Sequence, residues 1–177
     1  MRDKCILPFL ITERLEFFQL TQADLPELEI LLGDTEIMYA WEHGFTKIES
    51  QAWLNENLRR YSSDGYSYWA VRKKNDGSLI GVMGILKEVA EGKQYIGIGY
   101  ILNKKYWGQG YAGEGTEALC QYAFRKLQLQ TLTAQVRTNN FASQHIAEGL
   151  GMKAMCNFVK IYRGQEMPHF LYTLDRD

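Results

Sequence analysis

The most informative segment of the chain is Tyr106-Trp107-Gly108-Gln109-Gly110-Tyr111-Ala112, which lies between a predicted strand and a predicted helix. Its two glycines allow backbone N–H groups to approach a bound ligand closely. The helix that starts near Tyr111 leaves its first N–H groups without helical acceptors and presents the positive end of its dipole. Together these features predict an anion site suited to a pyrophosphate group.

The same segment contains the spacing of a dinucleotide-binding fingerprint, G-x-G-x-x-G, over residues 108–113. In that fold the glycines lie in a tight turn straight after a strand, and an acidic residue about 20 positions later holds a ribose. Here the loop is longer, and the next predicted strand runs into Arg137-Thr138-Asn139-Asn140, which holds no acid. The context therefore disfavours a nicotinamide dinucleotide as ligand.

Outward from this segment, hydrophobic periodicity predicts an α+β chain in which antiparallel strands flank one β-α-β unit. Turn residues at Asn75-Asp76-Gly77 and Arg163-Gly164-Gln165 separate two pairs of strands. The predicted strands are Leu10 to Leu20, Tyr66 to Arg72, Leu79 to Leu86, Gln94 to Leu102, Thr131 to Val136, Met152 to Tyr162 and His169 to Leu174. The predicted helices run from Leu25 to Gly33, from Thr46 to Tyr61, from Tyr111 to Leu127 and from Phe141 to Leu150.

Composition excludes several classes of protein. The chain has 177 residues, of which 46% are hydrophobic and 23% charged, so we expect one ordered domain over residues 1–177. A formal net charge of −1 argues against nucleic-acid binding. No apolar run reaches the ~20 residues that cross a bilayer, so no membrane association is expected.

Two further features concern the compartment. The start, Met1-Arg2-Asp3-Lys4, leads into a short apolar stretch, Cys5 to Ile11, without a small-residue cleavage site, so we predict no signal peptide. The three cysteines, Cys5, Cys120 and Cys156, lack C-x-x-C spacing, which indicates a reducing cytoplasm and no metal site. Cys120 lies on the apolar stripe of its helix and is expected to pack in the core.

Four segments, in this order, resemble the GCN5-related N-acetyltransferases (GNAT), and in particular the ribosomal-protein alanine and serine N-terminal acetyltransferases. The resemblance covers nearly the whole chain. The segments are Leu10-Ile11-Thr12-Glu13-Arg14-Leu15, then Ile98-Gly99-Tyr100-Ile101-Leu102 with the glycine segment that follows, then Val136 to Ser143, and finally Gly149-Leu150-Gly151-Met152.

The resemblance implies a mixed, mostly antiparallel sheet of six to seven strands, with a central parallel pair that splays apart and four flanking helices. It implies acetyl-CoA as cosubstrate, with pantetheine in the splay along Ile101 and Leu102. Its pyrophosphate would lie on amides from Gln109 to Gly113. The implied cofactor-binding residues are thus Ile101, Leu102, Trp107, Gly108, Gln109, Gly110, Tyr111, Ala112, Gly113, Asn140 and Ser143.

Two positions depart from the wider family and leave the general base open. Gly97 stands where many members carry a carboxylate, and Ala147 stands where many carry a tyrosine acid. Ser143 is a candidate acid, with a helix-capping hydroxyl as the alternative. Glu42 or His43 is a candidate base, directly or through water, with acceptor recognition or a plain loop contact as the alternative. His169 is a further candidate, more typical of a buried structural histidine.

The resemblance thus implies an acetyl-CoA-dependent N-acetyltransferase. Its acceptor would be a primary amine, on a protein N-terminus or a small molecule, that attacks the thioester directly. The alternative is a non-catalytic acyl-CoA-binding sensor, suggested by Gly97 and Ala147. Either a monomer or a homodimer is compatible with the sequence.

Overall fold

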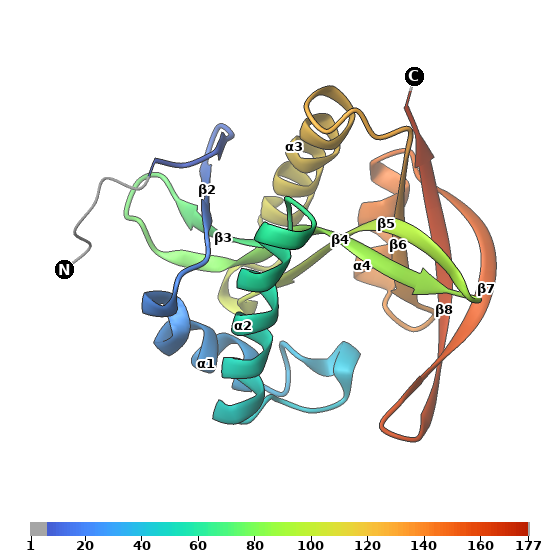
Figure 1. Ribbon diagram of the computed structural model, residues 1–177, viewed down its shortest axis with the longest axis horizontal. Helices are drawn as coiled ribbons and strands as arrows, with labels where there is room; N and C mark the ends of the chain where they lie inside the picture. Colours follow the sequence, from blue (N-terminus) through green and yellow to red (C-terminus); the bar gives the residue numbers. More distant parts are fainter. Residues whose placement is uncertain (1–6, 177) are drawn as a thin grey trace.

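In the computed structural model, which describes residues 7–176, one eight-stranded sheet has the order β1-β2-β3-β4-β5-β6-β8-β7 (Figure 1). The predictions made for Met1 to Lys4 and for Cys5 lie outside the described residues. The helices are α1 (Leu25–Gly33), α2 (Lys47–Ser63), α3 (Tyr111–Arg125) and α4 (Phe141–Gly149). The strands are β1 (Leu10–Ile11), β2 (Leu15–Gln19), β3 (Tyr68–Lys73), β4 (Leu79–Ala90), β5 (Lys93–Leu102), β6 (Thr131–Arg137), β7 (Lys153–Tyr162) and β8 (Gln165–Asp175).

The predicted class, a mixed and mostly antiparallel sheet with four flanking helices, is confirmed. Among the described helices none combines the length and apolarity needed to cross a bilayer. The strand count differs from prediction because the segment Leu10 to Leu20 is not one strand. The chain reverses after Ile11, where the Thr12 N–H donates to the Leu15 carbonyl at 2.9 Å, so that β1 pairs antiparallel with β2.

The β4–β5 hairpin is longer than predicted. Strand β4 continues past Leu86 to Ala90, and β5 begins at Lys93 instead of Gln94. Their ladder extends to the Ala90–Lys93 pair and closes in a tight turn at Glu91 and Gly92, with φ values of 49° and 71°. The charged residues of this stretch obscured the strand pattern in the sequence. The extension carries Glu88, which lies opposite Tyr95 near the start of β5.

The sheet opens at its only parallel pair among the described strands, β5 and β6. A single register pair, Gly97 opposite Thr133, joins them, and beyond it the strands diverge toward their C-terminal ends. The crossover between them contains α3, as parallel neighbours require. The predicted splay is therefore present, and the space between β5 and β6 beyond Gly97 and Thr133 is called the gap below.

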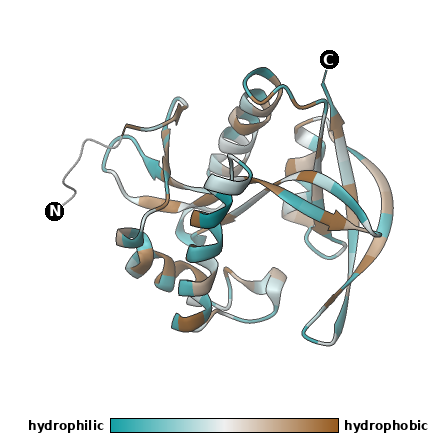
Figure 2. Cartoon of the chain, in the orientation of Figure 1, coloured by the Kyte–Doolittle hydropathy of each residue, from teal (hydrophilic) through white to brown (hydrophobic). Residues whose placement is uncertain are grey.

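Two cores cover the two faces of the sheet. On the α3/α4 face, Leu119, Cys120 and Ala123 of α3 and Ala147 of α4 pack against strands β2 to β6 and β8. On the α1/α2 face, α1 packs with Leu54 of the largely hydrophilic α2 (Figure 2) against β3, β4 and β5. Because side chains alternate along a strand, Ile98 and Leu102 belong to the first core and Ile101 to the second.

Candidate active site

The start of α3 is open to an anion. Gly108 and Gly110 have φ values of 70° and 81°, which favour glycine. The first helical bond runs from the Glu114 N–H to the Gly110 carbonyl at 3.0 Å, so the three preceding helical amides point out of the helix end. Thr46 and Asn140 cap α2 and α4 with their side chains, whereas no side chain of the described residues caps α3.

Arg14 braces this loop from the N-terminal segment. Its Nη1 donates to the Gln109 carbonyl at 3.0 Å, its Nε pairs with Glu114 Oε2 at 2.6 Å, and its guanidinium lies 4.3 Å from the Tyr111 ring centroid. Thr12 Oγ1 donates to the other oxygen of Glu114 at 2.5 Å. Arg14 thus neutralises Glu114, the one acid in the first turn of α3, so that this carboxylate does not oppose an anion at the free amides. In the sequence this segment is part of the family resemblance, which assigns Arg14 no role.

Of the two residues whose backbone was predicted to bond pantetheine in the gap, Leu102 faces the gap and Ile101 does not. The ideal Cβ of Gly81 on β4 would lie 2.2 Å from the Ile101 carbonyl oxygen, so that oxygen faces β4 rather than the gap. The backbone groups of the alternate residues, Tyr100 and Leu102, face the gap in such a ladder. The Trp107 indole Nε1 donates to the Leu102 carbonyl at 2.9 Å and fixes the loop to the end of β5.

Ser143 lies across the gap from β5 on the α3/α4 face. Its hydroxyl is 2.9 Å from the Tyr100 hydroxyl, and its N–H donates to the Asn140 side-chain oxygen at 3.1 Å. Burial raises the pKa of Tyr100 to about 12, partly offset by the hydrogen bond with Ser143. The two hydroxyls therefore form a proton-holding pair that bridges β5 and α4.

A groove of about 630 Å³ runs between α3 and α4, next to the start of α3. It contains both polar and apolar side chains. It is lined by Gly113, Glu117, Cys120, Gln121, Phe124, His145, Ile146, Gly149, Leu150, Leu174 and Asp175. Burial raises the pKa of the Cys120 thiol to about 12, so this residue packs as an inert thiol, as predicted.

Glu42 lies at the mouth of the gap on the α1/α2 face, in a left-handed conformation with φ of 62°. Its Oε1 accepts a hydrogen bond from Arg137 Nη2, at the end of β6, at 2.8 Å. Tyr39, three residues earlier, makes an edge contact with Trp107 at a centroid distance of 6.4 Å. The loop therefore spans the mouth of the gap, from the residues that follow β5 to the end of β6.

The neighbouring His43 is held away from Ser143 and Tyr100. Its Nε2 lies 3.3 Å from Glu49 Oε1 on α2, and its Nδ1 lies 3.1 Å from the Trp41 carbonyl. Its ring stacks on Tyr162 of β7 at 6.0 Å. Glu42 and His43 therefore both lie on the α1/α2 face, where they contact Arg137, Glu49 and Tyr162.

The structure also shows the surroundings of Ala147 and Gly97, which depart from the wider family, and of the candidate base His169. Ala147 is 3% exposed and packs in the α3/α4 core, so its position does not face the gap. His169 is buried, with Nδ1 at 2.7 Å from the Met167 carbonyl and its ring stacked on Phe158, and burial lowers its pKa. The place of a side chain at Gly97 is occupied: an ideal Cβ there would lie 2.2 Å from Glu88 Oε2.

The splayed parallel pair beside an uncapped, glycine-led helix is the arrangement that the resemblance implies. The family model for the acetyltransferase (GNAT) domain matches residues 14–153, and the chain belongs to this family. The uncharacterised protein YkkB of Bacillus subtilis is 30% identical over 144 residues, which cover 81% of this chain and 84% of YkkB.

Solved structures share the fold. A GNAT-family acetyltransferase from Bacillus anthracis superposes with a TM-score of 0.81 at 22% identity, covering 94% of this chain and 97% of that one. RimL, the ribosomal L7/L12 α-N-protein acetyltransferase in complex with coenzyme A, superposes with a TM-score of 0.79 at 18% identity, with the same coverage. The chain is accordingly an N-acetyltransferase that uses acetyl-CoA as cosubstrate and an amine as acceptor.

Proposed function

We propose that acetyl-CoA binds with its pyrophosphate on the amides from Gln109 to Gly113 and its pantetheine in the gap. The uncapped start of α3, which opens beside the gap, is the observation that carries this proposal. Arg14 supports the site, because it holds the loop through the Gln109 carbonyl and neutralises Glu114 beside the place where the phosphates would lie. The groove between α3 and α4 begins at Gly113 and has room for the nucleotide end of the cofactor.

In this arrangement the thioester carbonyl lies near Gly97, where a backbone N–H of the diverging strands can polarise it. The neutral amine attacks the carbonyl carbon, forms the C–N bond and expels the CoA thiolate as the C–S bond breaks, and the new amide nitrogen gives up one proton to water. The Ser143 hydroxyl, backed by that of Tyr100, supplies a proton to the leaving sulfur. Asn140 orients Ser143 through its cap on α4.

The proposed acceptor is a protein N-terminus, with a small primary amine as the second candidate. The mouth of the gap on the α1/α2 face is bounded by the 39–43 loop, Arg137 and Tyr162, which belong to three different segments. A rim built from three segments offers several contacts to an extended peptide end. The likeness to RimL, which is named for acetylation of a ribosomal protein's α-amine, also supports a protein N-terminus as acceptor.

Two measurements test the proposal in turn. Calorimetric titration with acetyl-CoA tests the cofactor site, and absence of binding at millimolar ligand would contradict it. Thiol release with peptides that begin with alanine or serine, compared with spermidine and an amino sugar, then tests the acceptor. Faster turnover of the peptides than of the small amines is expected; the reverse order would assign a small-molecule acceptor. Binding without turnover of any acceptor would favour the sensor alternative.

A further inference from the structure

One carboxylate of the α1/α2 face reaches the point where the gap begins. Glu88 lies on the extended part of β4, opposite Tyr95. An ideal Cβ at Gly97 would lie 2.2 Å from Glu88 Oε2 and 3.4 Å from Thr133 Oγ1. Gly97 and Thr133 are the one register pair that joins β5 to β6, so Glu88 places its carboxylate over the junction of the diverging strands. The absent side chain of Gly97 leaves the space that this carboxylate occupies.

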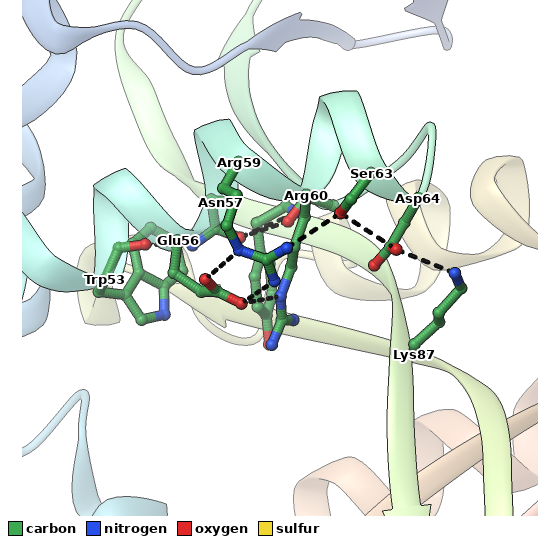
Figure 3. A network of polar contacts seen from close by, with 10 residues as sticks. Trp53, Glu56, Asn57, Arg59, Arg60, Ser63, Asp64 and Lys87 are labelled. Atoms are coloured by element: carbon green, nitrogen blue, oxygen red, sulfur yellow. Dashed lines mark hydrogen bonds and ion pairs between the residues drawn. The ribbon is translucent and has the colours of Figure 1, made fainter.

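This carboxylate has no hydrogen-bond partner among residues 7–176. Glu88 Oε2 is fully buried and unsatisfied. Arg60, one of the two cations whose charge acts on Glu88, is engaged elsewhere, as Figure 3 shows: its Nε pairs with Glu56 at 2.9 Å. A buried polar group without a partner costs free energy, so a native one calls for a functional explanation.

Three ionisable side chains from separate elements face Glu88. They are Tyr68 of β3, Arg60 of α2 and Lys160 of β7. Burial raises the pKa of Glu88, and the charges of Lys160 and Arg60 lower it in part. Burial likewise lowers the pKa of Lys160. A carboxylate whose pKa is raised toward the working pH is a better proton acceptor than an exposed one.

We propose that Glu88 is the general base of this acetyltransferase and that it accepts the proton of the acceptor ammonium from the α1/α2 face. The inference rests on the proposed function, because it needs the thioester near Gly97. The N–H bond of the ammonium breaks, and its proton goes to Glu88, directly or through one water. The amine lone pair then forms the C–N bond, the C–S bond breaks, and the thiolate takes a proton from Ser143 on the opposite face. The new amide nitrogen loses its second proton, which returns through water to Ser143. Each cycle returns one proton from Glu88 to solvent.

Glu88→Gln is the direct test, because it keeps the shape of the side chain and removes the proton acceptor. We expect kcat with an alanine-led peptide to fall about 100-fold or more, the lower range of positioned proton transfer, with the acetyl-CoA Kd unchanged. Glu91→Gln, an exposed change in the turn of the same hairpin, is the matched control and should leave kcat unchanged.

The outcomes separate the two proposals. If wild-type protein does not bind acetyl-CoA in the calorimeter, the proposed function fails. If it binds and turns over, and Glu88→Gln retains full kcat, the assignment of Glu88 is overturned and the proposed function stands. If Glu88→Gln lowers kcat and weakens acetyl-CoA binding equally, Glu88 has a structural role and the inference is also overturned.

Two further readouts respond only to a base. The kcat of wild type should rise with pH through the pKa of Glu88, and Lys160→Met should move this rise to higher pH, because the Lys160 charge lowers that pKa. In a Glu88→Ala background, Gly97→Asp returns a carboxylate to the vacated space from β5 and should restore at least about tenfold of the lost kcat. An unmoved pH profile together with no rescue would contradict the assignment.

Discussion

The two faces of the sheet meet at the gap but are assembled in different ways. On the α3/α4 face, the glycine loop, Tyr100, Asn140 and Ser143 come from one stretch of about 45 residues, β5 to α4. On the α1/α2 face, the polar groups Glu42, Glu88, Arg137 and Lys160 come from four distant segments. A contiguous site leaves a motif in the sequence, whereas a dispersed one becomes visible only when the strands are in register. The cofactor side was therefore predictable, and the acceptor side was not.

The largest expected effect on cofactor binding falls on the contiguous side. Gly110→Glu adds a negative charge and a Cβ at the start of α3, where φ is 81°, and should raise the acetyl-CoA Kd about 100-fold by calorimetry, roughly 2.7 kcal/mol. The matched control is Gly164→Glu in the β7–β8 turn, where φ is 78° and no described atom lies within 4 Å of the new Cβ. The control carries the same backbone strain away from the site, so it should keep the wild-type Kd. An equal rise in the acetyl-CoA Kd of both variants would contradict the anion site at the start of α3.

A smaller effect is expected where the two strands of the gap are bridged. Ser143→Ala and Tyr100→Phe each remove one hydroxyl of the pair and should lower kcat about tenfold with little change in the acetyl-CoA Kd. The loss stays below the ~10²–10⁴ of positioned proton transfer. The reason is that a thiol with a pKa of ~8.5 leaves readily without a proton. Stopped-flow thiol release measures kcat; a parallel loss in Kd would instead assign these hydroxyls to cofactor binding.

A milder change should follow from loosening the rim of the dispersed side. Glu42→Gln weakens the contact with Arg137, a partly exposed ion pair of the kind worth at most ~1 kcal/mol. We expect the KM for the peptide acceptor to rise about threefold while kcat is kept. This result would assign Glu42 to acceptor binding and leave proton transfer to Glu88. A loss of kcat comparable to that of Glu88→Gln, at constant KM, would instead support the prediction of Glu42 as base.

The smallest expected effect is on stability and its pH dependence. A carboxyl whose pKa is raised on folding binds more protons in the folded state, so the free energy of unfolding falls as pH rises from the unfolded pKa through the folded one. Glu88→Gln lacks this fall. Its Tm should exceed that of wild type at pH 8 by about 2–4 °C, the shift that roughly 1 kcal/mol gives in a chain of this size, and should match wild type near pH 4. A lower Tm at pH 8, followed by circular dichroism, would mean that the carboxylate stabilises the fold.

From local signals the sequence predicted the α+β class and the four helices, and through the family resemblance it implied the splayed pair. It missed the reversal after Ile11 and the extension of β4, since both depend on which segment pairs with which. A role for Arg14 is not predictable from the sequence, because its partners, Gln109 and Glu114, lie about 100 residues away. The assignment of a single domain over residues 1–177, the oligomeric state and the cytoplasmic location stay predictions.

The sequence by itself determined that a glycine-led helix follows a strand. It also determined that this helix presents free amides, because helix geometry leaves the first N–H groups unpaired wherever a helix begins. Only the tertiary structure decided which carboxylate lies over the junction of the diverging strands. Glu88 and Gly97 are nine positions apart on antiparallel strands, and their approach depends on the register of a hairpin whose turn lies at Glu91 and Gly92. A shift of one residue would turn that carboxylate to the opposite face.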